Sequence, residues 1–432
     1  NREDRETLQA IWKDLCYLCA SDFRTFATDE KHIWFRNRMG QTIYRLENLL
    51  GQKMDALGID GKKVIINPHR EQSIGNVFDI KVSLPEGEHR ENVGLKIDDR
   101  LVPTQDDYIE YYRDGSVRSA IVSARPRLSP SSINRVETTT SQEIKEKGNI
   151  SILRDKNIVR TPNVMIQLSQ KRGATIEGLT YPKISDRKMI FRLPHGYFGS
   201  IRLSDGSYSG DMILHDRSGL VINDLQNVVI RYPESSEYLS MYIPVRAKIM
   251  TPLGDFWKTY RVYIDEPRVD LIYQFQLKPV SPFYFRIGNV VINPEAFDKS
   301  SLYYATVNGG EDMETYPLNG REVIHDRPVD LTVSTHHSLG ATEGWITIGD
   351  QDKSVSVITD KGQLYSVPLL RYEEFQSIYF LRVSHSIGET DETAHNFWQG
   401  HNKVAFTIVA HHNQHEEIRQ KSLFMNQGII TM

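Results

Sequence analysis

Four stretches decide the fold: LSMYIPVRAKI at residues 239–249, YRVYI at 260–264, VDLIYQFQL at 269–277 and FYFRIGNVVI at 283–292. Each alternates apolar with polar residues or holds a short apolar run, and Gly, Pro or Asp residues lie between them. This period of two is typical of β-strands, whose successive side chains point to opposite faces of a sheet. Because no amphipathic helix intervenes, the pattern predicts antiparallel sheets rather than a parallel α/β sheet.

The same texture extends in both directions and predicts a mainly β protein. Residues 150–432 read as one large antiparallel β-supersandwich of galactose-mutarotase-like type, and residues 59–149 as a small β domain. Within the small domain, Pro, Ser and Thr concentrate at residues 125–147, which predicts a mobile loop or linker.

Residues 1–58 differ, because their apolar residues recur at intervals of three and four. This spacing predicts two helices between residues 4 and 52, with Gly51 and Gly58 marking the end of the second. The N-terminal segment is therefore expected to be helical and to pack against another part of the protein.

The composition excludes several classes of protein. Of the 432 residues, 39% are hydrophobic and 25% charged, which is ordinary for a globular chain of two or three domains. The net charge is −4 and the basic residues are scattered, so we expect no nucleic-acid partner. No apolar run of about 20 residues is present, so we expect no membrane span. The 21 tyrosines suit sheets and also sugar binding, because aromatic rings stack on pyranoses.

The ends and the cysteines bear on the cellular context. The chain starts NREDRETLQA, without a Met or the apolar core of a signal peptide, so we expect residue 1 to follow processing or to lie inside a longer polypeptide. Two cysteines, Cys16 and Cys19, cannot form a disulfide framework. We therefore expect a cytoplasmic location, with secretion left open.

Three regions resemble a known family. They are the helical segment at 15–50, the stretch Asn163-Val164-Met165-Ile166-Gln167-Leu168 with Gly173 and residues 176–181, and Trp345-Ile346-Thr347-Ile348-Gly349-Asp350 with 355–360, 369–371 and 393–410. Together they resemble the part of α-mannosidase-type glycoside hydrolases of family 38, and of their family 57 relatives, that follows the catalytic barrel. The resemblance implies a helical segment followed by a β-supersandwich.

The same resemblance implies that the catalytic groups lie elsewhere. The family's barrel carries the nucleophile and the acid, and we expect it to precede residue 1 as a partner domain. Where family 38 has a His-His-Asp that supplies a zinc ligand, this chain has Ala20, Ser21 and Asp22. The ligand histidine is missing, which favours the metal-free family 57 type. We expect no metal and no cofactor, and the catalytic residues are unknown.

Two clusters are candidates for contacting carbohydrate. The first is Asp22 and Arg24 at the junction of the predicted helices, where an N-cap with an ion pair is the simpler interpretation. The second comprises His195, Tyr197, Asp211 and His215, in a Gly-rich region whose simpler interpretation is an exposed hairpin.

Other residues suit chemistry less well. Cys16 and Cys19 form a C-x-x-C without a second pair and are expected to be core thiols. His411, His412 and His415 have spacings found in zinc sites, but a solvent-facing tail is the better interpretation. His336-His337 with Glu343 offers a mutarotase-like pair, which sequence proximity alone does not support.

Three functions remain open. The first is the C-terminal, non-catalytic portion of a glycoside hydrolase acting on α-glycans, which supports the active site or binds an oligosaccharide or polysaccharide. The second is a stand-alone carbohydrate-binding or structural assembly protein. The third is a mutarotase-like sugar enzyme. An upstream barrel-encoding segment would favour the first of these.

Overall fold

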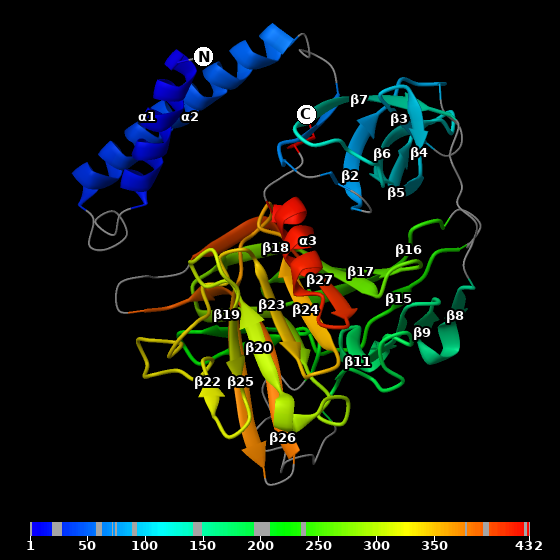
Figure 1. Cartoon of the computed structure of the whole chain (residues 1–432), viewed down its shortest axis with the longest axis vertical. Helices are drawn as coiled ribbons and strands as arrows, with labels where there is room; N and C mark the ends of the chain where they lie inside the picture. Colours follow the sequence, from blue (N-terminus) through cyan, green and yellow to red (C-terminus); the bar gives the residue numbers. More distant parts are fainter. Residues whose placement is uncertain are drawn as a thin grey trace.

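The computed structural model has three parts: two N-terminal helices, a small β unit and a large β-sandwich (Figure 1). It describes residues 2–19, 28–57, 63–70, 72–73, 76–88, 93–140, 149–193, 208–234, 239–375, 378–391, 397–426 and 430–431. Strands dominate these residues and their pairings are antiparallel, which confirms the predicted mainly β fold with a helical N-terminal segment.

The helical pair consists of α1 (Arg2–Leu18) and α2 (Asp29–Leu57). Ile11 and Leu18 are buried in α1, and the carboxylate of Asp14 pairs with Arg38 at 2.5 Å and Arg45 at 3.2 Å in α2. The expected helix end at Gly51 is wrong, because α2 continues through this residue to Leu57. A single glycine costs a helix only about 1 kcal/mol, which the flanking turns offset.

The small β unit is built from two sheets, of five and three strands among the described residues. The five-stranded sheet has the order β28 (Ile430–Thr431), β1 (Val64–Asn67), β7 (Ser132–Thr139), β3 (Gly94–Ile97) and β4 (Arg100–Val102). The three-stranded sheet has the order β2 (Phe78–Ser83), β6 (Val117–Ala124) and β5 (Thr104–Tyr111). Alternate residues of these strands, Val82, Leu95 and Val122 among them, form its core.

Strand β7 corrects the loop expected at 125–147. Residues 132–139 pair with β1 on one side and β3 on the other. Two buried side chains fix this strand inside the sheet despite its Ser and Thr content. Val136 packs in the core, and the side-chain amide of Asn134 donates to the Ile65 carbonyl. Residues 141–148 lie outside the described part of the chain.

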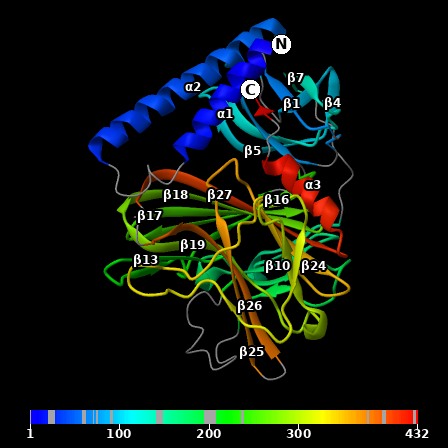
Figure 2. The same ribbon diagram turned by 60° about the vertical axis from the view of Figure 1, so that its left-hand side comes forward.

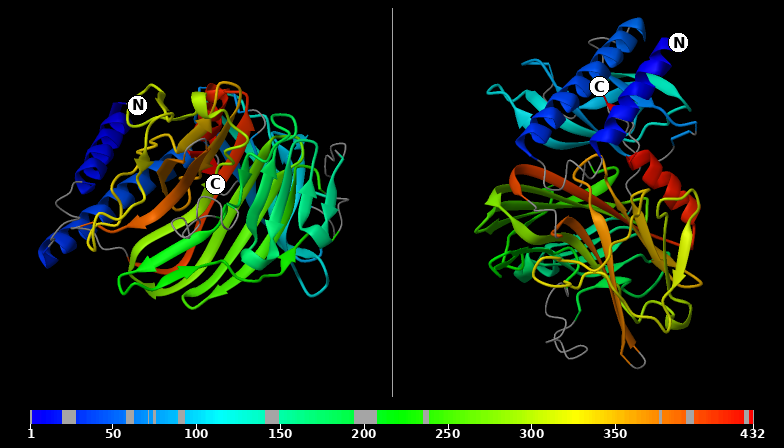
Figure 3. Two further views of the ribbon diagram at one scale, coloured as in Figure 1. Left: turned by 90° about the horizontal axis from the view of Figure 1, so that it is seen from below. Right: turned by 90° about the vertical axis from the view of Figure 1, so that its left-hand side faces the viewer.

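The sandwich stacks a nine-stranded sheet on a six-stranded one. The larger sheet has the order β15 (Ile230–Arg231), β16 (Tyr242–Thr251), β17 (Gly254–Tyr263), β18 (Arg268–Val280), β27 (Trp398–His411), β24 (Ser354–Thr359), β23 (Trp345–Gly349), β20 (Tyr303–Thr306) and β21 (Glu314–Pro317). The smaller has the order β14 (Val221–Asn223), β13 (Met212–Asp216), β19 (Pro282–Val291), β26 (Ile378–Glu389), β25 (Val367–Phe375) and β22 (Val323–Ile324). The long strands of both sheets curve around one core (Figure 3).

A further sheet and short helical turns complete the sandwich. This five-stranded sheet has the order β12 (Ile190–Phe191), β11 (Thr175–Thr180), β10 (Met165–Ser169), β9 (Ile158–Arg160) and β8 (Ser151–Leu153). Gly173, with φ of +62°, lies between β10 and β11, as the resemblance implied for a strand pair joined by a glycine turn. Its left-handed conformation suits glycine. Residues 330–334 share the alternating apolar pattern from which we expected strands, but this segment is irregular.

Helix α3 (His415–Asn426) lies between the sandwich and the small β unit (Figures 1 and 2). Its Ile418 packs with Trp345 and Val409 of the sandwich, and its Phe424 ring contacts His69 of the small β unit with centroids 4.8 Å apart. After α3, β28 adds a strand to β1. The C-terminal segment thus contacts both parts.

This helix overturns the solvent-facing tail expected for His411 and His415, whereas His412 is exposed as expected. His411 is buried at the end of β27, where its Nε2 lies 2.7 Å from Ser356 Oγ and its Nδ1 accepts from the amide of Gln414. His415 begins α3, and its Nε2 lies 2.9 Å from Tyr303 Oη. The two rings therefore serve as hydrogen-bonding groups at the start of the helix.

Candidate functional site

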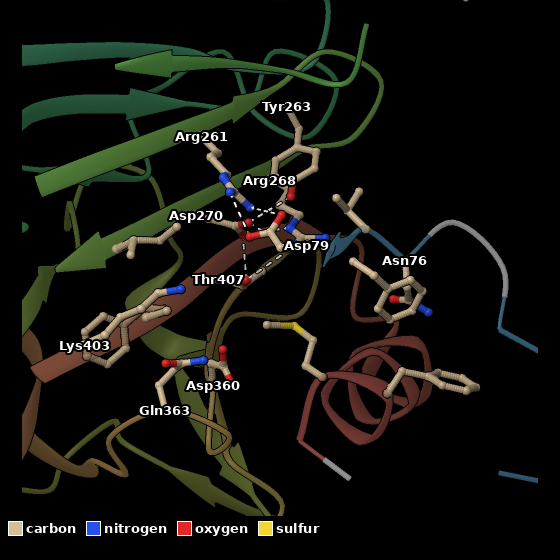
Figure 4. Close-up of a pocket in the computed structure, with 17 residues that line it drawn as sticks. Asn76, Asp79, Arg261, Tyr263, Arg268, Asp270, Asp360, Gln363, Lys403 and Thr407 are labelled. Atoms are coloured by element: carbon tan, nitrogen blue, oxygen red, sulfur yellow. Dashed lines mark hydrogen bonds and ion pairs between the residues drawn. The ribbon is translucent and has the colours of Figure 1, made fainter. Parts of the chain in front are cut away.

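A polar pocket of about 260 Å³ lies where the small β unit, the nine-stranded sheet and α3 meet (Figure 4). Strand β2 contributes one wall, β17, β18 and β27 form the floor, and the turn after β24 forms the opposite wall. Its polar side chains are Asn76, Asp79, Arg261, Tyr263, Arg268, Asp270, Asp360, Gln363, Lys403 and Thr407. We call this site the polar pocket.

One ion pair joins the two parts of the protein across the polar pocket. Arg261 donates to both carboxylate oxygens of Asp79, at 3.0 and 2.8 Å, and its guanidinium lies 4.7 Å from the ring centroid of Tyr242. Burial raises the pKa of Asp79, but the charge and hydrogen bonds of Arg261 outweigh it and leave the pKa below its ordinary value. Asp79 is therefore ionised near neutral pH, and both of its carboxylate oxygens are bound by Arg261.

A second pair lies within β18. Arg268 donates to both oxygens of Asp270, at 2.8 and 3.0 Å, while Tyr263 and Thr407 donate to the same carboxylate at 2.8 and 2.6 Å. Burial opposes the charge of Arg268, yet the charge of Asp270 raises the pKa of the guanidinium. All hydrogen-bonding directions of Asp270 are thus occupied by protein groups.

Three side chains in the polar pocket, those of Asp360, Gln363 and Lys403, make few or no hydrogen bonds within the described residues. Asp360 accepts one bond, from the amide of Gly362 at 2.9 Å, in an Asp-turn of the sequence Asp360-Lys361-Gly362-Gln363. The turn is held against β27, because the Asp360 amide donates to the Ala405 carbonyl and the Leu364 amide to the Lys403 carbonyl. Within the described residues, the side chains of Lys403 and Gln363 make no hydrogen bond. Asp360 and Gln363 on that wall lie near Lys403 on the floor (Figure 4).

The carboxyl of Asp360 has an altered acidity. Burial raises its pKa, and the charges of Asp270 and Asp79 act in the same direction, while the Gly362 amide and Lys403 oppose them. Glycoside hydrolysis requires two free carboxyl groups, one as acid and one as base or nucleophile. In this pocket, both oxygens of Asp79 and both oxygens of Asp270 are already bound by arginines.

Four of the six sequence candidates, Asp22, Arg24, His195 and Tyr197, lie outside the described residues. The other two do not line the polar pocket. His215, in β13, is half-buried and stacks on Tyr284 with centroids 5.1 Å apart.

Asp211 is fully buried in the core of the sandwich, out of reach of a sugar in solvent. Its Oδ1 accepts from Asn289 at 2.6 Å. Nearby, Lys258 pairs with Asp224 at 2.7 Å and donates to the carbonyls of Gly173 and Gly210. Burial, with the charge of Asp224, raises the pKa of Asp211 to about 7. This network holds the β10–β11 connection against β17.

The remaining sequence candidates do not assemble into a site. Cys16 and Cys19 are exposed rather than core thiols. Glu343 is bound by Arg419 at 2.6 Å and by the indole N–H of Trp345 at 3.1 Å, and in the described structure it makes no contact with the exposed His336 or His337. No group of three or more His, Cys, Asp or Glu among the described residues could hold a metal ion. In that same part of the chain, every helix is too short or too polar to span a bilayer.

The polar pocket was missed although the sequence carries a signal for it. Arg261, Arg268 and Asp270 interrupt strands that are otherwise strongly apolar. Buried charges are rarely tolerated in strands unless they are paired, so opposite charges on neighbouring predicted strands point to a shared polar site.

Comparison with known proteins places the fold. No protein-family model matches the chain, and no curated protein sequence matches it. An α-mannosidase from Enterococcus faecalis V583 aligns over 91% of this chain and 49% of its own, with 9% identity and a TM-score of 0.52. A glycosyl hydrolase family 38 protein from Enterococcus faecalis aligns over 96% of this chain and 53% of its own, with 8% identity and a TM-score of 0.51. The chain thus has a family 38-like fold and spans about half the length of these two proteins, a likeness that does not select family 57.

Proposed function

We propose that this chain is the C-terminal, non-catalytic portion of a carbohydrate-active enzyme acting on α-glycans, and that the polar pocket binds carbohydrate. The observation that carries the proposal is the set of uncommitted groups, Asp360, Gln363 and Lys403, beside two saturated arginine–aspartate pairs. The family 38-like fold supports a connection with glycans.

The polar pocket offers what a sugar requires. A hydroxyl group both donates and accepts, and here Asp360 accepts, Lys403 donates and Gln363 does both. Apolar surface from Ile272 and Met425 lines the same site, and can cover the C–H face of a pyranose. The saturated Asp79 and Asp270 leave no second free carboxyl, so we expect binding without turnover.

The helical pair is the surface proposed for an upstream catalytic barrel. Large apolar side chains of α1 and α2 are solvent-exposed in this chain, namely Leu8, Trp12, Leu15, Tyr17, Ile33, Trp34, Met39, Ile43, Tyr44, Leu46 and Leu50. So many exposed large apolar side chains on two paired helices are unusual on a monomeric protein, and we take them as an interaction site. A domain that covers both helices would remove it from water.

Titration of the chain with mannan and α-glucan oligosaccharides, followed by NMR, tests the polar pocket. We expect dissociation constants near 1 mM, about −4 kcal/mol, because the open site covers only part of a ligand. Lys403→Met and Asp360→Asn should each weaken binding about tenfold, as expected for one lost charge-assisted hydrogen bond. The control Lys183→Met removes an exposed lysine and should change nothing. Equal binding by all variants, or release of reducing ends by the chain alone, would contradict the proposal.

The helical surface is tested by labelling Cys16 and Cys19 with a thiol reagent. Cys16 of α1 and Cys19, directly after it, are both exposed and should react rapidly in this chain. In a polypeptide that carries the proposed upstream barrel they should be protected, and Trp12→Glu with Tyr44→Glu should restore their reactivity. Identical labelling rates in the two polypeptides would argue that no domain covers the helices.

A further inference from the structure

A second hollow, of about 390 Å³, lies on the nine-stranded sheet. Trp257 of β17 forms its aromatic surface, with Arg246 and Lys248 from β16, Gln274 from β18 and His401 from β27 around it. We call it the Trp257 hollow.

The strand register places this hollow on the same face of the sheet as the polar pocket. Lys403 lies opposite Gln274, Gln274 opposite Trp257, and Trp257 opposite Lys248, across four adjacent strands. Residues directly opposite in an antiparallel ladder point to the same face. Lys403 lines the polar pocket while Gln274 lines the Trp257 hollow, so the two sites adjoin.

Their spacing follows from sheet geometry. Lys403 in β27 and Trp257 in β17 are separated by one intervening strand, β18, which corresponds to about 10 Å. Along β17 the same face carries Trp257, Thr259 and Arg261 in alternation, again passing from one site to the other. A short oligosaccharide can bridge this distance and a monosaccharide cannot.

The chemistry of the Trp257 hollow complements that of the polar pocket. The indole of Trp257 is half-buried, and the Lys248 ammonium lies 5.3 Å from its ring centroid. Within the described part of the chain, the indole N–H, the Gln274 amide and the His401 ring have no hydrogen-bond partner. An aromatic face beside such groups suits a pyranose, whose C–H surface stacks while its hydroxyls are hydrogen-bonded at the edge.

The charges of the Trp257 hollow are largely compensated. Arg246 forms an ion pair with Asp107, and Lys248 forms one with Asp255 at 2.6 Å. Arg231 at the rim is exposed and has no acidic partner among the described residues. The hollow therefore presents hydrogen-bonding groups more than net charge, which favours a neutral ligand over an acidic one.

We infer that the polar pocket and the Trp257 hollow are two adjoining subsites for one neutral oligosaccharide chain, with Trp257 as the stacking surface of the second. The inference rests on the proposed function and specifies its ligand. An oligosaccharide that occupies both subsites gains contacts that a monosaccharide lacks, so affinity should rise with chain length until both are filled.

The experiment uses the chain labelled with 5-fluorotryptophan, followed by ¹⁹F NMR. Its five tryptophans give few resonances, and Trp257→Phe assigns the one of interest. The ligands are a monosaccharide, a disaccharide, a tetrasaccharide and a hexasaccharide from the neutral mannan and α-glucan series, with a sulfated hexasaccharide for comparison. The resonance of buried Trp345 reports whether each variant is folded.

We expect the Trp257 resonance to shift only with the longer ligands, and the hexasaccharide to bind at least tenfold more tightly than the monosaccharide. Trp257→Ala should abolish this gain with length, and Trp257→Phe should retain most of it, while Lys403→Met should weaken ligands of every length. A silent Trp257 resonance and length-independent affinity, with Lys403→Met still weakening binding, would overturn the inference and leave the proposed function standing. Absence of all sugar binding would contradict both the inference and the proposed function. Tighter binding of the sulfated hexasaccharide than of the neutral one would show that the ligand is not a neutral oligosaccharide.

Discussion

The guanidinium of Arg261 donates to both carboxylate oxygens of Asp79, at 3.0 and 2.8 Å, and so ties β17 of the sandwich to β2 of the small β unit. Arg261 is nearly inaccessible, whereas one third of the Asp79 side chain faces solvent. Further polar contacts act alongside it, such as the Gln105 amide, which donates to the Tyr242 carbonyl at 2.9 Å. The wall of the polar pocket is thus positioned by paired side chains together with the apolar packing of Val77 against Tyr242 and Tyr263.

Asp79→Ala should lower the free energy of unfolding by about 2 kcal/mol, because it removes two charge-assisted hydrogen bonds and leaves the Arg261 charge poorly compensated. The partial exposure of Asp79 keeps the loss below that of a fully buried pair. Urea unfolding monitored by tryptophan fluorescence measures it. Glu86→Gln, on an exposed turn of the same unit, is the matched control and should lose less than about 0.5 kcal/mol.

Lys258 and Asp224 are both fully buried and lie 2.7 Å apart. Lys258→Met should destabilise the protein by about 3–5 kcal/mol, since it leaves the Asp224 carboxylate without its cation and the Gly173 carbonyl without its side-chain donor, while the Gly210 carbonyl keeps the Tyr273 hydroxyl. Adding Asp224→Asn should recover part of the loss, because no buried charge then remains. Thermal or urea unfolding of the unaltered chain, the two single variants and the double variant gives a double-mutant cycle for the pair. Strict additivity would show that the pair is not coupled.

The strands could be predicted because their burial follows a period of two. In 269–277, for example, Val269, Leu271, Tyr273 and Phe275 are buried while Ile272, Gln274 and Gln276 are more accessible, as the alternation requires. The helices α1 and α2 were predicted from their apolar spacing in the same way. These local patterns directly reflect the geometry of each element.

Features that depend on distant partners could not be predicted. Strand β7 has a polar sequence and is fixed by β1 and β3. Helix α3 was not predicted, because the hydrogen bonds of His411 before it and of His415 at its start are made with the distant Ser356 and Tyr303. The polar pocket joins Asp79 to groups more than 180 residues away, and no sequence pattern specifies that distance. Asp211 was selected as a polar residue in a Gly-rich region, but its carboxyl faces Asn289 in the core.

The stability of the protein should depend on the ionisation of Asp211. Its pKa is raised from the ordinary value of 3.8 to about 7, by burial and by the charge of Asp224. Since the folded state holds this proton more tightly than the unfolded state, the contribution to stability is complete below about pH 4 and is lost as the pH rises through 7. Asp211→Asn cannot ionise, so its urea midpoint should rise relative to that of the unaltered chain between pH 5 and pH 8.

The control for this experiment is Asp186→Asn, which changes an exposed carboxyl on a turn. Its urea midpoint should follow that of the unaltered chain throughout the same pH range. If the midpoint of Asp211→Asn also ran parallel at every pH, Asp211 would be ionised in the folded protein and the raised pKa would be wrong.

Gly173 and Gly219 separate two costs of replacing a glycine. Both have positive φ, +62° and +88°, so either Ala substitution carries the strain of a left-handed L-residue, about 1 kcal/mol. At Gly219 a Cβ would meet no atom within 4 Å, whereas at Gly173 it would lie 1.9 Å from the carbonyl oxygen of Asp224. That contact forces the backbone apart where the Gly173 carbonyl accepts from Lys258. Gly219→Ala should therefore cost about 1 kcal/mol and Gly173→Ala more than about 3 kcal/mol. The clash also disrupts the Lys258–Asp224 pair. The combined variant Gly173→Ala, Lys258→Met should therefore lose less free energy of unfolding than the sum of the losses of the two single variants, as measured by urea unfolding. Equal losses for the two glycine variants would show that the β10–β11 connection can move away from Asp224 without disturbing the buried pair.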